Sequence, residues 1–180
     1  DLDILLTGTG FTKIYRNNGD NTFTDQTSIS LAGMEWSSAD WGDYDNDGYV
    51  DILLTGNSGS SAYSKIYRNN RNGTFSDQTG ISLQALNSGS AIWGDYDNDG
   101  DLDILLSGWG YTKIYKNNSN NTFTEQTGIT LQGLNSTSIS WADYDNDGDL
   151  DILLTGSTYS GGTVRYSKIY KNNGNNTFTL

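Results

Sequence analysis

Apolar and polar residues follow one order four times along this chain, and that order predicts strands. In the second copy, "SADWGDY" (38–44) precedes "DILLTG" (51–56), which contains a short continuous apolar run. Such a run is typical of a strand buried on both faces. "KIYRNN" (65–70) and "GTFSDQT" (73–79) follow, the latter with β-branched and aromatic residues alternating with polar ones. Clusters of Gly, Asn and Ser separate the segments as turns, and no segment has a sustained 3.6-residue period, so we expect almost no helix.

The unit recurs at a nearly constant spacing. The aspartate before "ILL" is Asp3, Asp51, Asp103 and Asp151 in turn, at steps of 48, 52 and 48 residues. A period in this range indicates a repeat architecture, in which each unit covers an apolar face of its neighbour.

Four short antiparallel strands in about 50 residues correspond to one blade of a β-propeller. We therefore predict an all-β fold, a β-propeller of four-stranded antiparallel blades, with nearly four blades in a single repeat domain over residues 1–180. The expected blades are residues 1–28 (partial), 29–80, 81–128 and 129–180. A flat sandwich and an open β-solenoid are the alternatives.

The chain begins inside a unit, because Asp1-Leu2-Asp3 matches residues 101–103 at the end of an aspartate-rich stretch. The first blade therefore lacks its inner strand, which leaves fifteen expected strands. We expect the chain to be a window of a longer array or a processed piece. Closed propellers have roughly 4–8 blades, so ring closure would require more of the same chain or a second copy.

The stretch "DYDNDGYVD" (43–51) and its two later copies place aspartates at positions 1, 3, 5 and 9 and glycine at position 6. Alternate acids in a tight turn can face one ion, and glycine permits the sharp reversal. The backbone carbonyl at position 7 is a further candidate ligand. Oxygen ligands of this kind suit Ca²⁺, with Mg²⁺ as second choice. The candidate ligands are Asp43, Asp45, Asp47, Tyr49 and Asp51; Asp95, Asp97, Asp99, Asp101 and Asp103; and Asp143, Asp145, Asp147, Asp149 and Asp151.

The first half of each aspartate loop matches the EF-hand pattern, but the second half does not. Position 12 would need Glu and is Leu54, Leu106 or Leu154, and the flanking segments are strands. The loops are therefore predicted to be β-hairpin calcium loops, three full sites in all. The alternative is an acidic surface turn, since Asp, Asn and Gly favour turns. Carboxylates this close would repel one another strongly without an ion.

Composition and charge further limit the classes of function that this chain could have. The net charge is −12, and the aspartates at positions 1, 3, 5 and 9 of the loops make up twelve of the 22 acidic residues. The charge is thus concentrated where a counter-ion would bind. The chain contains no Cys and no His, which excludes disulfides and His-dependent catalytic triads. No basic patch is present for nucleic acid, and no apolar run is long enough to span a membrane.

The pattern D-x-D-x-D-G-x-x-D followed by "ILLTG" resembles the FG-GAP (or VCBS) repeat, the blade of integrin α-subunit propellers and of many bacterial secreted proteins. The resemblance covers essentially the whole chain, and "KIYRNN" and "NTFTDQT" are closer to the bacterial version. It implies that each loop joins the first two strands of a blade and binds calcium. The first loop is only a remnant, so no normal site is expected at Asp1 and Asp3.

The resemblance also implies that ligands bind on the face opposite the calcium loops. The link between the second and third strands varies in length and would lie there. Exposed aromatic rings among Gly, Ser and Asn suit sugar rings, whereas local packing of these rings is the alternative. The candidate ligand-binding residues are Phe11, Tyr63, Trp109, Tyr111, Tyr159 and Tyr166. Two other aromatic sets recur in every full unit and are expected to pack between blades: Trp41, Trp93 and Trp141, and Tyr44, Tyr96 and Tyr144.

The leading hypothesis is an extracellular, calcium-stabilised, non-enzymatic propeller for adhesion or recognition, with a glycan or a cell-surface protein as partner. Extracellular calcium suits sites of modest affinity. The alternative is a structural repeat protein that self-assembles into a closed oligomeric ring or an extracellular filament. We expect a homo-oligomer or part of a longer repeat chain. An enzyme is the weakest hypothesis, because the closely spaced carboxylates are already assigned to calcium.

Overall fold

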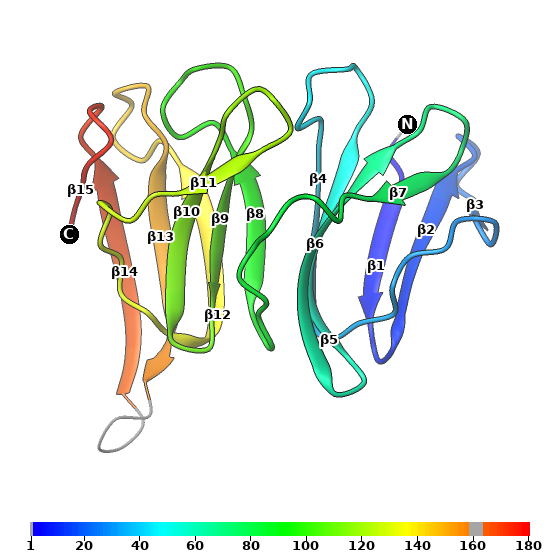
Figure 1. The fold of residues 1–180 in the computed structure, drawn as a ribbon, viewed down its shortest axis with the longest axis horizontal. Helices are drawn as coiled ribbons and strands as arrows, with labels where there is room; N and C mark the ends of the chain where they lie inside the picture. The colour runs from blue at the N-terminus through cyan, green and yellow to red at the C-terminus, as the bar shows by residue number, and fades with distance from the viewer. Residues whose placement is uncertain (1, 159–163) are drawn as a thin grey trace.

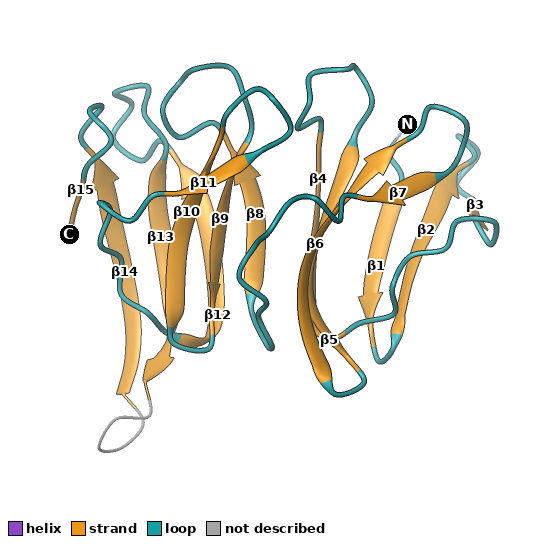
Figure 2. Ribbon diagram, in the orientation of Figure 1, coloured by secondary structure: helices purple, strands orange, loops and turns teal. Residues whose placement is uncertain are grey.

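The computed structural model describes residues 2–158 and 164–180, and these contain fifteen strands and no helix (Figure 2). The strands form four antiparallel sheets, one per sequence unit, as the all-β prediction requires. Sheet 1 comprises β1 (Ile4–Gly8), β2 (Phe11–Asn17) and β3 (Phe23–Asp25). Sheet 2 comprises β4 (Glu35–Gly42), β5 (Asp51–Ser58), β6 (Ser61–Asn69) and β7 (Phe75–Asp77). Sheet 3 comprises β8 (Ser90–Gly94), β9 (Asp103–Gly108), β10 (Tyr111–Asn117) and β11 (Phe123–Glu125). Sheet 4 comprises β12 (Asn135–Ala142), β13 (Asp151–Thr158), β14 (Val164–Asn172) and β15 (Phe178–Thr179).

Within each sheet the strands lie in chain order, so every connection joins neighbouring strands. The three aspartate loops join the first and second strands of sheets 2, 3 and 4 and lie together at one end of the molecule (Figure 1). The turns between β1 and β2, β5 and β6, and β9 and β10 lie at the opposite end (Figure 1). The described part of the chain thus has no helix that could cross a membrane.

The hairpin of β5 and β6 is longer than the hairpin of β1 and β2. Its additional residues extend the paired strands rather than the turn. The pairing of β5 with β6 continues to Ser58 opposite Ser61, and Tyr63 lies opposite Gly56 within it. Tyr166 has the same strand position in sheet 4, opposite Gly156. The sequence analysis placed these two tyrosines in a link of variable length. In the structure they lie in paired strands instead.

The apolar core consists of three clusters, each between two consecutive sheets. The alternation of side chains along a strand produces this arrangement, because neighbouring residues point to opposite faces. In β5, Ile52 and Leu54 pack with Ile14 of sheet 1, whereas Leu53 packs with Ile104 of sheet 3. The same alternation in β9 and β13 builds the cluster between sheets 3 and 4.

The recurrent tryptophans pack between sheets, as predicted. A Cβ on Gly42 would lie 2.6 Å from the Trp93 ring of the next sheet, and one on Gly94 would lie 2.5 Å from the Trp141 ring. Glycine at these two positions therefore leaves room for the indole. Tyr44 stacks on Trp93 with ring centroids 5.9 Å apart.

The expectation that the three recurrent tyrosines share one role is wrong for Tyr144. Tyr44 and Tyr96 are buried, whereas Tyr144 is exposed. The physical reason is that Tyr44 and Tyr96 are covered by aromatic rings of the following sheet, and no described sheet lies against this side of sheet 4.

Candidate functional site

Each aspartate loop is closed by the carboxylate at its first position. In the first loop, Asp43 accepts hydrogen bonds from the backbone N–H of Asp47 at 3.0 Å and of Gly48 at 2.8 Å. Gly48 has a φ of +87°, which a residue with a Cβ rarely adopts. Asp95 and Asp143 make the same pairs of bonds in the other two loops. The repeated residues therefore fold into one repeated loop geometry.

The aspartate at position 9 anchors the loop to the sheet. Asp51 is fully buried and accepts hydrogen bonds from the backbone N–H of Tyr44 at 3.2 Å and of Asn69 at 2.8 Å. The corresponding bonds recur at Asp103 and Asp151. This carboxylate thus links the loop's start to the end of the third strand.

Three carboxylates in each loop lie close enough to share a cation. Their oxygen atoms lie within 4.8 Å of one another in the sets Asp43, Asp45 and Asp51; Asp95, Asp97 and Asp99; and Asp143, Asp145 and Asp151. Asp45 Oδ1 and Asp97 Oδ1 are buried and have no hydrogen-bond partner. A buried carboxylate oxygen without a partner is costly unless a cation compensates it. The residues therefore fit a hard divalent ion.

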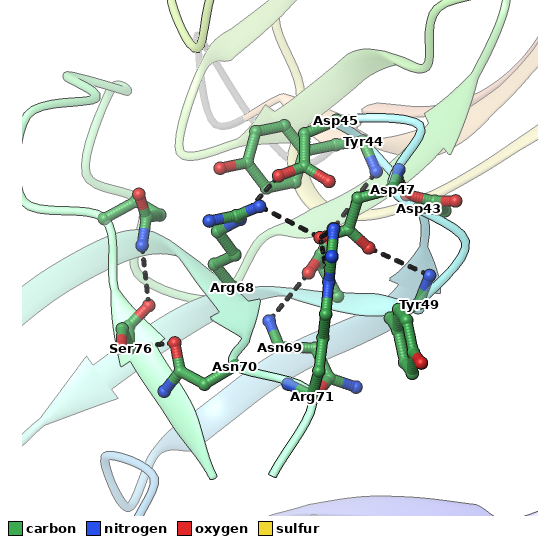
Figure 3. A network of polar contacts seen from close by, with 12 residues as sticks. Asp43, Tyr44, Asp45, Asp47, Tyr49, Arg68, Asn69, Asn70, Arg71 and Ser76 are labelled. Atoms are coloured by element: carbon green, nitrogen blue, oxygen red, sulfur yellow. Dashed lines mark hydrogen bonds and ion pairs between the residues drawn. The ribbon is translucent and has the colours of Figure 1, made fainter. Parts of the chain in front are cut away.

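The basic residue near the end of each third strand was not singled out by sequence reasoning. Arg68 on β6 pairs with Asp45 and, at 2.9 Å, with Asp47, and Arg71 reaches Asp47 at 2.8 Å (Figure 3). Lys116 and Lys171 pair with the aspartates at positions 3 and 5 of their own loops. These cations neutralise the carboxylates and compete with a metal ion for them. The sequence feature that could have identified this residue is the Arg or Lys in "KIYRNN" and "KIYKNN", which recurs in every unit.

Position 4 of one loop contacts the following loop. Asn46 Nδ2 donates to the Asp101 carboxylate at 2.7 Å, and Asn98 Nδ2 donates to Asp149 at 2.8 Å. The Asp101 and Asp149 side chains at position 7 therefore accept hydrogen bonds between loops. The backbone N–H at position 7 bonds to the aspartate at position 5 in all three loops.

At the opposite end of the molecule, a hollow of about 170 Å³ lies between sheets 3 and 4. Trp109, in the turn between β9 and β10, lines it and is 67% exposed. Its other lining residues are Asn87, Ser88, Asn135 and Ser136. An exposed indole beside amide and hydroxyl groups offers both stacking and hydrogen bonding.

The other aromatic candidates within the described residues do not line this hollow. Tyr111 is half-buried against the core between sheets 2 and 3, and its hydroxyl contacts Tyr115 at 2.7 Å. Tyr63 and Tyr166 also pack against core clusters. Phe11 is partly exposed, and Tyr159 lies outside the described residues. The structure also exposes Trp36 on β4, which the sequence analysis did not select.

Comparison with models of known protein families identifies the family of this chain. The FG-GAP-like repeat pattern matches residues 1–54, 43–106 and 95–154, each match containing or overlapping an aspartate stretch. The chain belongs to the FG-GAP-like repeat family. Its three matched segments together cover most of the sequence, in agreement with the repeat found in the apolar pattern. A comparison with curated proteins found no match.

Among solved structures, this FG-GAP-like chain is similar to a lectin from Agrocybe aegerita, described as specifically recognising non-reducing terminal N-acetylglucosamine. The two are 18% identical with a TM-score of 0.60, and the alignment covers 98% of this chain. The chain spans about 61% of the length of that lectin. At this identity the likeness establishes a shared fold.

Burial shifts the ionisation of two aspartates at position 9 of the FG-GAP-like loops, Asp51 and Asp103. Desolvation raises the pKa of Asp51 to about 6 and that of Asp103 to about 7. A raised folded-state pKa means that the folded protein binds these protons more tightly than the unfolded chain. Their contribution to stability is therefore complete below the ordinary aspartate pKa and is lost as pH rises through about 6 and 7.

We therefore expect opposite pH dependences with and without calcium. In EDTA, the contribution of Asp51 and Asp103 lowers Tm as pH rises from 5 to 8, because burying their charged form is costly. In excess calcium, Tm should instead rise over the same interval, because protons compete with the metal for the carboxylates. Thermal unfolding at several pH values in both conditions checks this. The same slope in both conditions would contradict it.

Proposed function

We propose that this chain is an extracellular, calcium-stabilised propeller module that recognises glycans and has no enzymatic activity. Two features support this: the three aspartate loops at one end and the tryptophan-lined hollow at the other. Membership of the FG-GAP-like family supports the calcium part of the proposal, and the fold shared with a lectin supports the recognition part.

Calcium has a structural role in this proposal. The aspartate at position 1 orders the loop backbone, and the one at position 9 ties the loop to the sheet. A calcium ion held by these carboxylates would remove their mutual repulsion, so that its binding energy would stabilise the folded state. Its oxygen ligands would come from the three sets of neighbouring aspartates: Asp43, Asp45 and Asp51; Asp95, Asp97 and Asp99; and Asp143, Asp145 and Asp151. Extracellular calcium concentrations suit such sites.

The hollow at Trp109 is the observation that carries the proposed recognition. A sugar ring has an apolar face that stacks on an exposed indole, while its hydroxyl or acetamido groups bond to neighbouring polar side chains. Asn87 and Asn135 supply amide donors and acceptors, and Ser88 and Ser136 supply hydroxyls. The hollow is small and open, which suits a terminal sugar of a longer glycan. A sugar of the N-acetylglucosamine type is the first to test, because the lectin of similar fold is described as binding it.

Replacing the exposed indole should remove most of this affinity. Titration calorimetry with oligosaccharides ending in N-acetylglucosamine, in calcium, is expected to show at least about tenfold weaker binding for Trp109→Ala, equivalent to about 1.4 kcal/mol. Trp36→Ala is the matched control, because Trp36 is similarly exposed but lies outside the hollow. Equal losses in both variants, or no binding of the folded wild type to any glycan on an array, would refute glycan recognition.

Self-assembly into a ring or filament is the second candidate function. It is favoured by the apolar faces that the first and last sheets leave exposed. This candidate is compatible with glycan binding, because the exposed faces and the hollow involve different residues.

A further inference from the structure

The three aspartate loops share one backbone geometry but differ in their number of carboxylates. We name them by their sheets: the sheet 2 loop (43–51), the sheet 3 loop (95–103) and the sheet 4 loop (143–151). Position 7 is Tyr49 in the sheet 2 loop, whereas it is Asp101 or Asp149 in the other two. The sheet 2 loop therefore has four carboxylates, and each of the other loops has five.

The basic residues beside the loops differ in the opposite sense. Two guanidinium groups pair with the sheet 2 loop, those of Arg68 on β6 and Arg71 in the turn before β7. Among the described residues, each of the other loops pairs with a single ammonium group, that of Lys116 or Lys171. Four carboxylates against two cations leave the sheet 2 loop at −2, whereas five against one leave the other loops at −4.

Arg71 is held against the sheet 2 loop from two sides. Its Nη2 lies 2.8 Å from the Asp47 carboxylate, and its Nε donates to the same group at 3.2 Å. The guanidinium carbon also lies 5.2 Å from the centroid of the Tyr49 ring (Figure 3). An aromatic face attracts a guanidinium group. Tyr49 therefore puts a ring that holds a cation where the other loops have a further carboxylate.

The backbone of the β6–β7 turn gives no reason for an arginine at this place. Arg71 has a φ of +61°, in the left-handed region where a residue with a Cβ is uncommon. The equivalent residues of the other units are Gly19, Ser119 and Gly174. The contacts with Asp47 and Tyr49 are thus what distinguishes this arginine from its equivalents.

The two guanidinium groups cover the carboxylates that a cation in the sheet 2 loop would need. The Asp47 side chain is 7% exposed, whereas Asp99 and Asp147 at the same loop position are 34% and 35% exposed. Arg68 also pairs with Asp45, one of the three neighbouring carboxylates of this loop. Positive charge at these distances repels a divalent cation, and the affinity of calcium loops depends on the charge of their ligands.

We propose that Arg71, held by Tyr49, makes the sheet 2 loop a calcium site of lower affinity that fills after the loops of sheets 3 and 4. This inference rests on the proposed calcium binding and adds an order to it. Filling of the sheet 2 loop requires the guanidinium groups to give up its carboxylates, a cost that is smaller in the other loops. At calcium concentrations that saturate sheets 3 and 4, the occupancy of this loop still responds to changes in calcium.

The experiment measures calcium-binding isotherms by titration calorimetry on the calcium-free chain and its variants. Arg71→Ser and Tyr49→Asp each introduce the residue that sheet 3 or sheets 3 and 4 have at that position. Arg165→Ser is the matched control, because it removes an exposed arginine on β14 that pairs with none of the loops. Asp45→Ala and Asp97→Ala, at position 3 of their loops, assign the phases to individual loops. Circular dichroism in excess calcium confirms that each variant is folded.

The wild type is expected to bind two ions tightly and a third with a Kd at least about tenfold higher. Asp45→Ala should remove the weak phase, whereas Asp97→Ala should remove a tight one. Arg71→Ser and Tyr49→Asp should each bring the third Kd to within about threefold of the others, and Arg165→Ser should leave it unchanged.

Three ions of equal affinity in the wild type would overturn this inference alone. A weak phase that survives Asp45→Ala, or a third Kd that is unchanged in Arg71→Ser, would do the same. A folded chain that binds no calcium would instead overturn the proposed calcium binding together with this inference.

Discussion

Removing calcium is expected to lower the Tm of this chain by about 15 °C or more. At a free calcium concentration of about 100 times Kd, one site adds about 2.7 kcal/mol to the free energy of unfolding. In a protein of this size, 1 kcal/mol shifts Tm by roughly 2–4 °C. The effect is large because three loops each bring three carboxylates within 4.8 Å. Thermal unfolding in excess calcium and in EDTA measures the difference.

Two features limit how far the calcium-free protein is destabilised. Arg68, Lys116 and Lys171 partly neutralise the loops, and the apolar clusters between sheets do not involve the metal. We therefore expect a folded but less stable protein in EDTA. Excess Mg²⁺ is the control for simple charge screening, and it should recover less of the Tm than calcium does, because Mg²⁺ demands stricter geometry. An unchanged Tm in EDTA would show that the loops are acidic turns alone.

The second large effect is expected for Asp103→Ala in the presence of calcium. Asp103 is fully buried and accepts hydrogen bonds from the backbone N–H groups of Tyr96 and Asn117. Each buried donor left without a partner costs about 1–3 kcal/mol. With the weakened metal site added, we expect the free energy of unfolding to fall by about 3 kcal/mol or more, measured by urea unfolding.

Asp3→Ala is the matched control for this substitution. Asp3 makes the corresponding bond to the backbone N–H of Asn17 at 2.8 Å, but it is exposed, and only a remnant of a loop precedes it. Its replacement should cost less than about 1 kcal/mol, since an exposed N–H bonds to water instead. In EDTA the cost of Asp103→Ala should shrink, because the calcium-free protein must bury that charge. Equal costs for both variants in calcium would contradict the anchoring role of Asp103.

The strands and the aspartate loops could be predicted because their signals are local. The run "ILL" with its β-branched neighbours defines each buried strand, and the alternation of Ile52, Leu53 and Leu54 accounts for two separate interfaces. The loop pattern likewise places the aspartates within nine residues of one another. Short-range spacing was therefore sufficient for the sheets and the candidate metal ligands.

Features that depend on neighbouring segments could not be predicted in the same way. Arg68 is more than twenty residues from Asp45 and reaches it only because β6 returns beside the loop. The hollow at Trp109 combines residues of two sheets, and its sequence signal was limited to an aromatic residue among glycines. The aromatic candidates do not form one site for a similar reason. Tyr63 and Tyr111 pack against core clusters, and no local sequence pattern predicts that packing.

The measurement that tests the account most directly is the number of calcium ions bound per chain, determined by equilibrium dialysis at millimolar-range free calcium. The account predicts three ions, one for each full aspartate loop, and two for the Asp97→Ala variant, which removes one carboxylate of the second set. A chain that binds no calcium, or that binds the same number after this substitution, would contradict it.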